Sequence, residues 1–177
     1  MRARLGAARY GEAKELSVGD STGFGNGTDP YDLARFVDAQ EHDYDQALFE
    51  IRSGRKRSHW IWYIFPQFEG LGFSTNSRRY SIKSLAEAEA YLSHPLLGPR
   101  LREICEAAVV VEGRSAFEIF GSPDEAKLKS CATLFASVSQ TGSVFDRLLE
   151  KYFEGRADLK TLRLLGSQGV LGRPTSS

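Results

Sequence analysis

The sequence predicts an all-α fold, namely a compact single-domain multihelical bundle with short helices and a glycine-bearing loop. Apolar residues recur at the i, i+3, i+4, i+7 spacing of an amphipathic helix, and serine or aspartate stands before several of these runs. No internal repeat and no alternation of strands with helices is visible. With 177 residues, the chain can bury roughly two thirds of its unfolded surface in one core.

Three segments are expected along the chain. Residues 1–28 show no periodicity and contain the glycine-rich stretch 19–27, so we expect a disordered N-terminal extension. The helical domain should span residues 29–165, because Asp29 suits an N-cap and Pro30 suits the first helical position. Residues 166–177 are expected to form a C-terminal tail.

The first half of the domain should hold two helical segments and an aromatic one. Asp43 is expected to cap the second segment, and Gly54 to end it in the left-handed conformation. The stretch 58–65 has a composition that also suits a strand, but its neighbours favour a short buried helix capped by Ser58. Pro66 ends that helix and opens the glycine-bearing loop over residues 66–77.

The second half should be helical almost throughout. Capping boxes at Ser115 and Ser122 open two of the helices, and Ser143 starts a third. The expected helices are a turn around Tyr80 and Ile82, then 84–92, 99–111 closed by Gly113, 115–121, 122–137, 143–153 stopped by Gly155, and 158–165.

Composition excludes several classes of protein. The formal net charge is zero, which gives no global electrostatic case for nucleic acid or an anionic membrane. No run of 18 apolar residues could span a membrane, and residues 1–9 are basic without the apolar region of a secretory signal. Organelle targeting by residues 1–11 stays open, with a cytoplasmic location favoured. Cys105 and Cys131 lack metal-ligand spacing and fit buried small hydrophobes, so we expect neither a metal nor a cofactor.

The stretch from Lys56 to Ser74 is the expected functional surface. Arg55, Lys56 and Arg57 immediately precede a predicted helix start, which already carries a partial positive charge. Cations there suit a phosphate or carboxylate cradle. The alternative, slightly favoured by base rates, is a solvated basic loop paired with acids of another helix.

His59 and Trp60 follow these cations. Neighbouring charge should lower the pKa of His59, leaving a neutral imidazole that could act as a general base. The alternative is a core histidine satisfied by a backbone carbonyl. Trp60 could stack on a base or sugar, although such dense aromatic runs usually pack in a core. Gln67 offers an amide, and Gly72 permits close backbone approach to a ligand, although a tight connecting loop would use the same residues.

Two earlier residues complete the candidate site. Gln40 and Tyr44 lie on the core-facing stripe, where Gln40 either braces the aromatic helix or reaches into a pocket. Asp124 and Lys127 are most simply a dipole-matched acid and a surface pair. The candidate residues are therefore His59 for catalysis and Gln40, Tyr44, Lys56, Arg57, Trp60, Gln67, Gly72 and Ser74 for ligand binding.

The motifs themselves resemble a known family. The runs Asp29-Pro-Tyr-Asp-Leu33, Gly54-Arg-Lys-Arg-Ser-His-Trp-Ile-Trp-Tyr-Ile-Phe-Pro-Gln67 and Ile119-Phe-Gly-Ser-Pro-Asp124 are similar to those of a domain-of-unknown-function family, sometimes mislabelled calpastatin. The resemblance covers about residues 29 to 165 and implies a compact multihelical fold. It implies no reaction. Asn76-Ser77 and Cys131-Ala132 depart from the residues common in that family.

Three functions remain open. The favoured one is binding of a small anionic or nucleotide-like ligand around Lys56–Gln67, with hydrolase or transferase chemistry as its enzymatic form. This hypothesis expects Lys56, His59 and Gln67 to converge on one pocket. The first alternative is a non-catalytic protein-interaction module with an exposed apolar patch. Nucleic-acid binding is the least favoured, because the net charge is zero and no known module signature is present. Its candidate residues are Arg55, Lys56, Arg57, Arg78 and Arg79.

Overall fold

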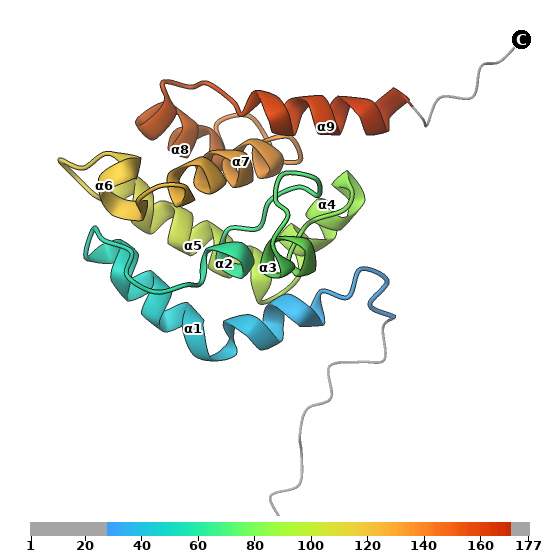
Figure 1. Ribbon diagram of the computed structural model, residues 1–177, viewed down its shortest axis with the longest axis horizontal. Coiled ribbons are helices and arrows are strands. Elements are labelled where there is room, and N and C mark those ends of the chain that lie inside the picture. Colours follow the sequence, from blue (N-terminus) through green and yellow to red (C-terminus); the bar gives the residue numbers. More distant parts are fainter. Residues whose placement is uncertain (1–27, 171–177) are drawn as a thin grey trace, which may run out of the picture.

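Nine helices make up the part of the chain that the computed structural model describes, residues 28–170, with side chains through residue 167. No strand occurs within this range, which confirms the all-α prediction (Figure 1). The predicted disorder over residues 1–27 concerns residues outside the described range. The helices are α1 Ala34–Arg52, α2 Ile61–Ile64, α3 Thr75–Arg79, α4 Leu85–Ser93, α5 Leu97–Val110, α6 Ala116–Phe120, α7 Asp124–Ala136, α8 Val144–Phe153 and α9 Leu159–Val170.

Helix α1 is a single 19-residue helix, so the prediction of two segments divided at Asp43 was wrong. No glycine or proline interrupts the stretch, and the side chain of Asp43 instead accepts a hydrogen bond from the Tyr63 hydroxyl. Asp29 lies in a turn before the helix, where its Oδ2 accepts the Ala34 N–H at 3.0 Å. The predicted left-handed stop is confirmed, because Gly54 has a φ of 70° and its N–H donates to the Ile51 carbonyl.

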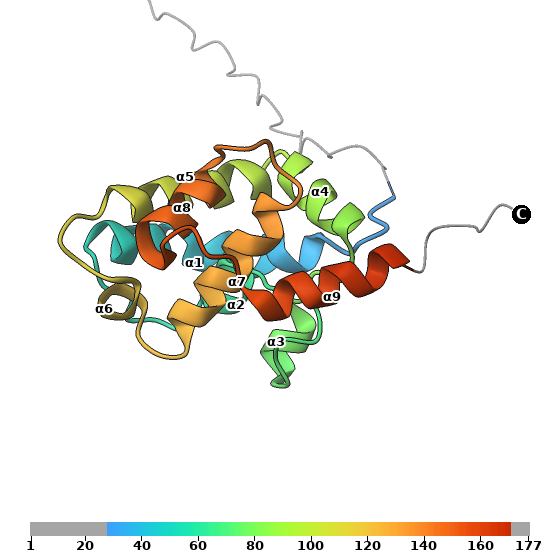
Figure 2. The same cartoon turned by 90° about the horizontal axis from the view of Figure 1, so that it is seen from above.

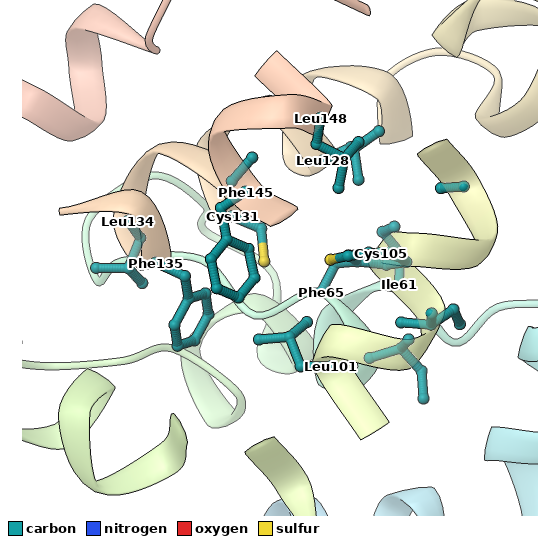
Figure 3. Close-up of a cluster of buried hydrophobic side chains, with 14 of the residues drawn as sticks. Ile61, Phe65, Leu101, Cys105, Leu128, Cys131, Leu134, Phe135, Phe145 and Leu148 are labelled. Carbon is teal, nitrogen blue, oxygen red and sulfur yellow. The ribbon is translucent and has the colours of Figure 1, made fainter. Parts of the chain in front are cut away.

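One cluster of the core lies where α2, α5, α7 and α8 meet, as Figure 3 shows, and α1, α4 and α6 also contribute to the core. Cys105 and Cys131 both lie in this cluster and are almost fully buried, which confirms their prediction as small hydrophobes. Their sulfur atoms point toward one another in Figure 3. The other labelled side chains are Ile61, Phe65, Leu101, Leu128, Leu134, Phe135, Phe145 and Leu148.

Local capping determined several helix starts. The capping box at Ser115 is confirmed, and Ser143 starts α8 as expected through a box with Asp146. Ser122 does not cap α7, whose N-cap is Pro123 without a side-chain bond. Because Pro123 delays the helix start, the Glu125 N–H donates to the Gly121 carbonyl rather than to a serine hydroxyl.

Other boundaries shifted by a few residues. Helix α5 begins at Leu97, two residues before the expected start at Pro99. Helix α9 continues to Val170, so residues 166–170 are helical rather than part of a tail, and residues 171–177 lie outside the described range. No helix among the described residues combines the length and apolar character needed to cross a membrane.

The glycine-bearing loop is held between α2 and α3. Helix α2 spans only four residues, and Trp60 rather than Ser58 stands at its N-cap. Helix α3 ends at Arg79, so the expected helical turn around Tyr80 and Ile82 was wrong. Ile82 instead forms an isolated parallel bridge with Phe68, which anchors the loop at its base.

Candidate functional site

The expected anion-binding position just before α2 is occupied by a carboxylate of the protein itself. Glu50, at the end of α1, is 2% exposed. Its oxygens accept hydrogen bonds from the Arg57 N–H at 2.8 Å, the Ser58 N–H at 3.0 Å and the Trp60 indole N–H at 2.9 Å. The sequence predicted that this basic stretch would bind an external anion. The backbone N–H groups of Arg57 and Ser58 instead bind the carboxylate of Glu50.

These bonds keep Glu50 ionised. Burial by itself raises the pKa of this carboxyl, but hydrogen bonds from the side chains of Gln46 and Ser58 and from two backbone N–H groups outweigh it. The net result lowers the pKa of Glu50 from 4.5 to about 2. A carboxylate so fully satisfied is a structural anchor and has no free oxygen for a ligand's proton.

Lys56 is neutralised by a different helix. Its Nζ lies 2.7 Å from Asp124 Oδ2, while the Nζ of Lys127 lies 2.8 Å from Oδ1 of the same carboxylate. Burial raises the pKa of Asp124, but hydrogen bonds from Lys127 and Lys56 outweigh it, so the pKa is lowered overall. Asp124 and Lys127 do pair as expected, but the pair is largely buried and shared with Lys56 rather than lying free on the surface.

Each of these lysines lies over a tryptophan. Lys56 Nζ is 5.0 Å from the Trp60 ring centroid, and Lys127 Nζ is 4.6 Å from the Trp62 ring centroid. Trp60 is 1% exposed and belongs to the core, whereas Trp62 is only partly buried. The indole that a ligand can reach is therefore Trp62 rather than Trp60.

Two clefts flank Asp124. We call the first the glycine-loop cleft, with a volume of about 460 Å³, and the second the α6 cleft, with a volume of about 390 Å³. The glycine-loop cleft is lined by Trp62, Gln67, Leu71, Gly72, Phe73, Ser74, Ser77, Pro123, Ala126, Lys127, Ser130, Asp158 and Lys160. The α6 cleft is lined by Arg55, Lys56, Arg114, Phe117, Glu118, Ile119, Phe120 and Gly121.

Both clefts adjoin the start of α7, since the α6 cleft includes Gly121 and the glycine-loop cleft includes Pro123 and Ala126. In Figure 2, α3 and α6 project from the same face, with the start of α7 between them. Asp124 is the first residue of α7 and forms ion pairs with Lys56 and Lys127. Lys127 lines the glycine-loop cleft, and Lys56 lines the α6 cleft. A third cavity of about 620 Å³ lies apart from both, between α4, α5 and the start of α8.

The glycine loop has the close packing that its sequence suggested. A Cβ on Gly72 would lie 2.6 Å from the Ser77 Cβ, so only glycine allows the loop to approach α3 this closely. Ser74 caps α3 by accepting the Ser77 N–H at 3.1 Å. Phe73, between them, is 81% exposed and lies at the cleft.

The expected convergence of Lys56, His59 and Gln67 does not occur. Lys56 and Gln67 line different clefts, and the exposed His59 lines neither. His59 precedes α2 instead of occupying its first position, and no described side chain or carbonyl hydrogen-bonds its imidazole, so it is not a satisfied core histidine either. Arg57 is also exposed and lines neither cleft; only its backbone N–H has a defined structural partner.

Gln40 and Tyr44 belong to the core. Gln40 is 1% exposed and its Nε2 donates to the Tyr63 carbonyl at 2.8 Å and the Tyr91 hydroxyl at 3.0 Å, so it braces the aromatic segment, which was one of its two expected roles. The Tyr44 hydroxyl lies 2.7 Å from Glu103 Oε2, to which it donates. Burial and this carboxylate raise the pKa of Tyr44. Neither residue lines either cleft.

Three of the expected binding residues do come together, joined by others that the sequence did not indicate. Gln67, Gly72 and Ser74 line the glycine-loop cleft together with Lys127 of α7 and Lys160 of α9. No local signal identifies the two lysines, because only tertiary packing brings their helices to the loop. Within the described residues, no group of three histidine, cysteine, aspartate or glutamate side chains could hold a metal ion.

Comparisons with known proteins place the chain among uncharacterised relatives. A family model described as protein of unknown function (DUF1810) matches residues 30–165. The chain is also similar to the crystal structure of the conserved hypothetical protein Rv1873 from Mycobacterium tuberculosis, with 51% sequence identity and a TM-score of 0.77. That match covers 78% of this chain and 99% of the other. No curated protein matches the sequence.

Proposed function

Because the chain belongs to the DUF1810 family of proteins of unknown function, its activity has to be inferred from its own geometry, and we propose that it binds a small anionic, nucleotide-like ligand in the glycine-loop cleft. One observation carries the proposal. Lys127 lies over the partly buried Trp62 ring inside a cleft of about 460 Å³ that also contains amide and hydroxyl groups. A cation beside an aromatic face suits a ligand that joins a planar ring to a negative group.

Five of the lining side chains have a direct role in contacting the anion or the ring of the ligand. Lys127 uses one N–H for Asp124 Oδ1, which leaves two N–H groups for a phosphate or carboxylate, and Lys160 adds a second exposed cation. Trp62 and the exposed Phe73 provide surfaces on which a planar ring can stack. Gln67 can then read the edge of that ring through its amide.

Asp158 suits a sugar hydroxyl. Its Oδ2 accepts hydrogen bonds from the Thr161 N–H at 2.8 Å and the Thr161 hydroxyl at 2.7 Å, which fixes the carboxylate at the start of α9. The other oxygen, Oδ1, accepts no hydrogen bond from the described residues and can accept one from a ligand. A nucleoside phosphate carries a planar ring, hydroxyls and an anionic group together.

The proposal is for binding rather than for a nucleophilic reaction. Neither imidazole nor thiol lines the glycine-loop cleft within the described residues, and His59, the residue on which hydrolase or transferase chemistry depended, lies outside it. The protein-interaction alternative would rest on the same exposed Phe73. Nucleotide binding requires that the partly buried Lys127 contribute to the affinity for a free nucleotide, whereas a protein-interaction surface around Phe73 does not.

Tryptophan fluorescence provides the test. The protein has two tryptophans, so Trp62→Phe leaves only the buried Trp60 as a reporter. We expect nucleoside mono-, di- and triphosphates to quench the unmodified protein saturably, and this quenching to disappear in Trp62→Phe. Lys127→Gln should weaken binding about tenfold, as loss of one charge-assisted contact does.

The matched control is Lys129→Gln on the same helix. Lys129 lies 5.5 Å from the Phe153 ring centroid and lines neither cleft, so its loss should leave binding unchanged. Melting temperatures of all variants establish that they fold. Absence of saturable quenching, or quenching that survives both Trp62→Phe and Lys127→Gln, would overturn the proposal. Binding of the uncharged nucleoside with equal affinity would also contradict it.

A further inference from the structure

The α6 cleft has an excess of positive charge that the protein does not neutralise. We infer that it is a second, independent binding site for a small phosphate-bearing ligand, with Arg55, Lys56 and Arg114 as the anion-binding groups and Phe117 as an apolar contact. This site shares no lining residue with the glycine-loop cleft. It therefore goes beyond the proposed function and stands or falls separately from it.

The charge count of the α6 cleft supports an anionic ligand. Arg55 and Arg114 form no ion pair with any described residue, although both line the same cavity of about 390 Å³. Lys56 has Asp124 as its partner, but that carboxylate is shared with Lys127, so two lysines face one negative charge. The two arginines have no ion-pair partner, and Lys56 shares the carboxylate of Asp124 with Lys127. A further anion could therefore bind in the cleft.

Among the described residues, Glu118 is the one carboxylate that lines the cleft, and one of its two oxygens is engaged in the cap of α6. Glu118 Oε2 accepts the Ser115 N–H at 2.7 Å and the Ser115 hydroxyl at 2.8 Å, which closes the capping box of α6. Hydrogen bonds from Ser115, followed by the charge of Arg114, lower the pKa of Glu118. Glu118 thus remains ionised and offsets one positive charge of the cleft, which leaves an excess of positive charge because three cations line it.

Backbone geometry fixes the two arginines against α6. The Lys56 N–H donates to the Ile119 carbonyl at 2.7 Å, which holds the segment carrying Arg55 beside the helix. Gly54, with its φ of 70°, lets the Arg114 side chain lie across the turn, because a Cβ at Gly54 would come within 3.0 Å of Arg114 Cδ. The cations of the cleft are therefore placed by the fold from two segments far apart in sequence.

The apolar contact indicates a small organic phosphate rather than a bare ion. Phe117 is 61% exposed and lines the cleft beside the arginines, where it can cover the ring or hydrocarbon part of a ligand. Guanidinium groups bind phosphate and carboxylate oxygens alike through paired N–H donors, but a terminal phosphate has three oxygens and can contact Arg55, Lys56 and Arg114 together. The cleft is small, and the net charge of the whole chain is zero. Both facts favour a small ligand over a nucleic-acid strand, because a strand is bound through an extended positive surface.

Backbone NMR with inorganic phosphate and phenyl phosphate as probes tests this site. We expect saturable shifts at the amides of Lys56, Ile119 and Gly121, and tighter binding of phenyl phosphate than of inorganic phosphate through Phe117. Arg114→Gln and Arg55→Gln should each weaken binding about tenfold. Arg163→Gln on α9 removes the same charge from an exposed side chain outside both clefts and should change binding less than twofold.

The outcomes separate this inference from the proposed function. Binding that survives in Lys127→Gln but is weakened in both α6-cleft variants supports the inference even if the glycine-loop cleft binds nothing. Two independent arginine variants guard against one that does not fold, and melting temperatures identify that case. Shifts confined to the glycine loop would overturn the inference, as would an affinity in both arginine variants that is unchanged from that of the unmodified protein. Much tighter binding of a single-stranded oligonucleotide that is lost in the same variants would also overturn it.

Discussion

The Glu50 carboxylate accepts the Trp60 indole N–H at 2.9 Å, so that the end of α1 and the start of the aromatic segment share one buried hydrogen-bond centre. The same carboxylate accepts the Ser58 hydroxyl at 2.5 Å. These hydrogen bonds hold the segment from Arg57 to Trp60 against the end of α1. Other residues of the stretch still reach the clefts, since Lys56 lines the α6 cleft and Trp62 lines the glycine-loop cleft.

Replacing Glu50 by glutamine should destabilise the fold strongly. An amide accepts hydrogen bonds only at its oxygen, and an oxygen in the place of Oε2 would keep the three N–H donors of Arg57, Ser58 and Trp60. The amide NH2 would then stand in the place of Oε1, where the Gln46 amide and the Ser58 hydroxyl would lose their acceptor. We expect the free energy of unfolding to fall by on the order of 3 kcal/mol in urea titrations. Glu41→Gln, on the exposed face of the same helix, should change it by less than about 0.5 kcal/mol. A loss of similar size in both variants would argue against the anchor role.

Stability should also depend on pH in the acid range. The pKa of Glu50 is about 2 in the folded protein against an ordinary value of 4.5, so the unfolded state binds more protons between these values. The stabilisation is complete above about pH 5 and is lost as the pH falls toward 2, by about 2 to 3 kcal/mol from this group. The lowered pKa of Asp124 acts in the same direction. Unfolding free energies measured from about pH 7 down to about pH 3 should show a shallower decline in Glu50→Gln, and parallel curves would contradict the assignment.

Gly98 of α5 packs directly against the backbone of α4. A Cβ there would lie 2.0 Å from the Leu92 carbonyl oxygen, a backbone atom that cannot move aside cheaply. Gly98→Ala should therefore cost about 3 kcal/mol or prevent folding. Gly166→Ala in α9 is the matched control, since nothing lies within 4 Å of its Cβ, and it should stabilise the protein by up to about 1 kcal/mol. Thermal melts of both variants decide the matter, and equal melting temperatures would be incompatible with this packing.

The two cysteines should be unreactive in the folded protein. Burial raises the pKa of Cys105 and, well above its ordinary value, that of Cys131. A thiol-specific chromogenic reagent should modify neither at neutral pH in buffer, and both in concentrated urea. Cys105→Ala and Cys131→Ala assign each signal. Rapid modification of either thiol without denaturant would mean that the core around α5 and α7 opens readily.

Local chemistry explains which parts of the fold could be predicted from sequence. The serines at positions 84, 115 and 143 cap their helices because a side chain reaches an N–H only three residues ahead. Gly54 ends α1 for a similarly local reason. The same local reasoning failed at Asp43, where a good capping residue lies within a continuous helix, because packing of a long apolar face outweighs a weak local preference.

The candidate site could be predicted only in part. Gln67, Gly72 and Ser74 lie on one short loop, so their proximity follows from the chain itself. Trp60 and Trp62 stand two residues apart, and the sequence could not say which one the fold would bury. A four-residue helix gives too little periodicity to assign its faces.

What the sequence determined by itself is the all-α class, most helix starts and stops, and the glycine loop, since each depends on interactions across a few residues. The tertiary structure alone decided that Glu50 would occupy the expected anion-binding position before α2. It also decided that Asp124 would form ion pairs with both Lys56 and Lys127. These pairings join segments brought together by burial of a common core. Burial acts through total apolar area and shape, which no local pattern of residues encodes.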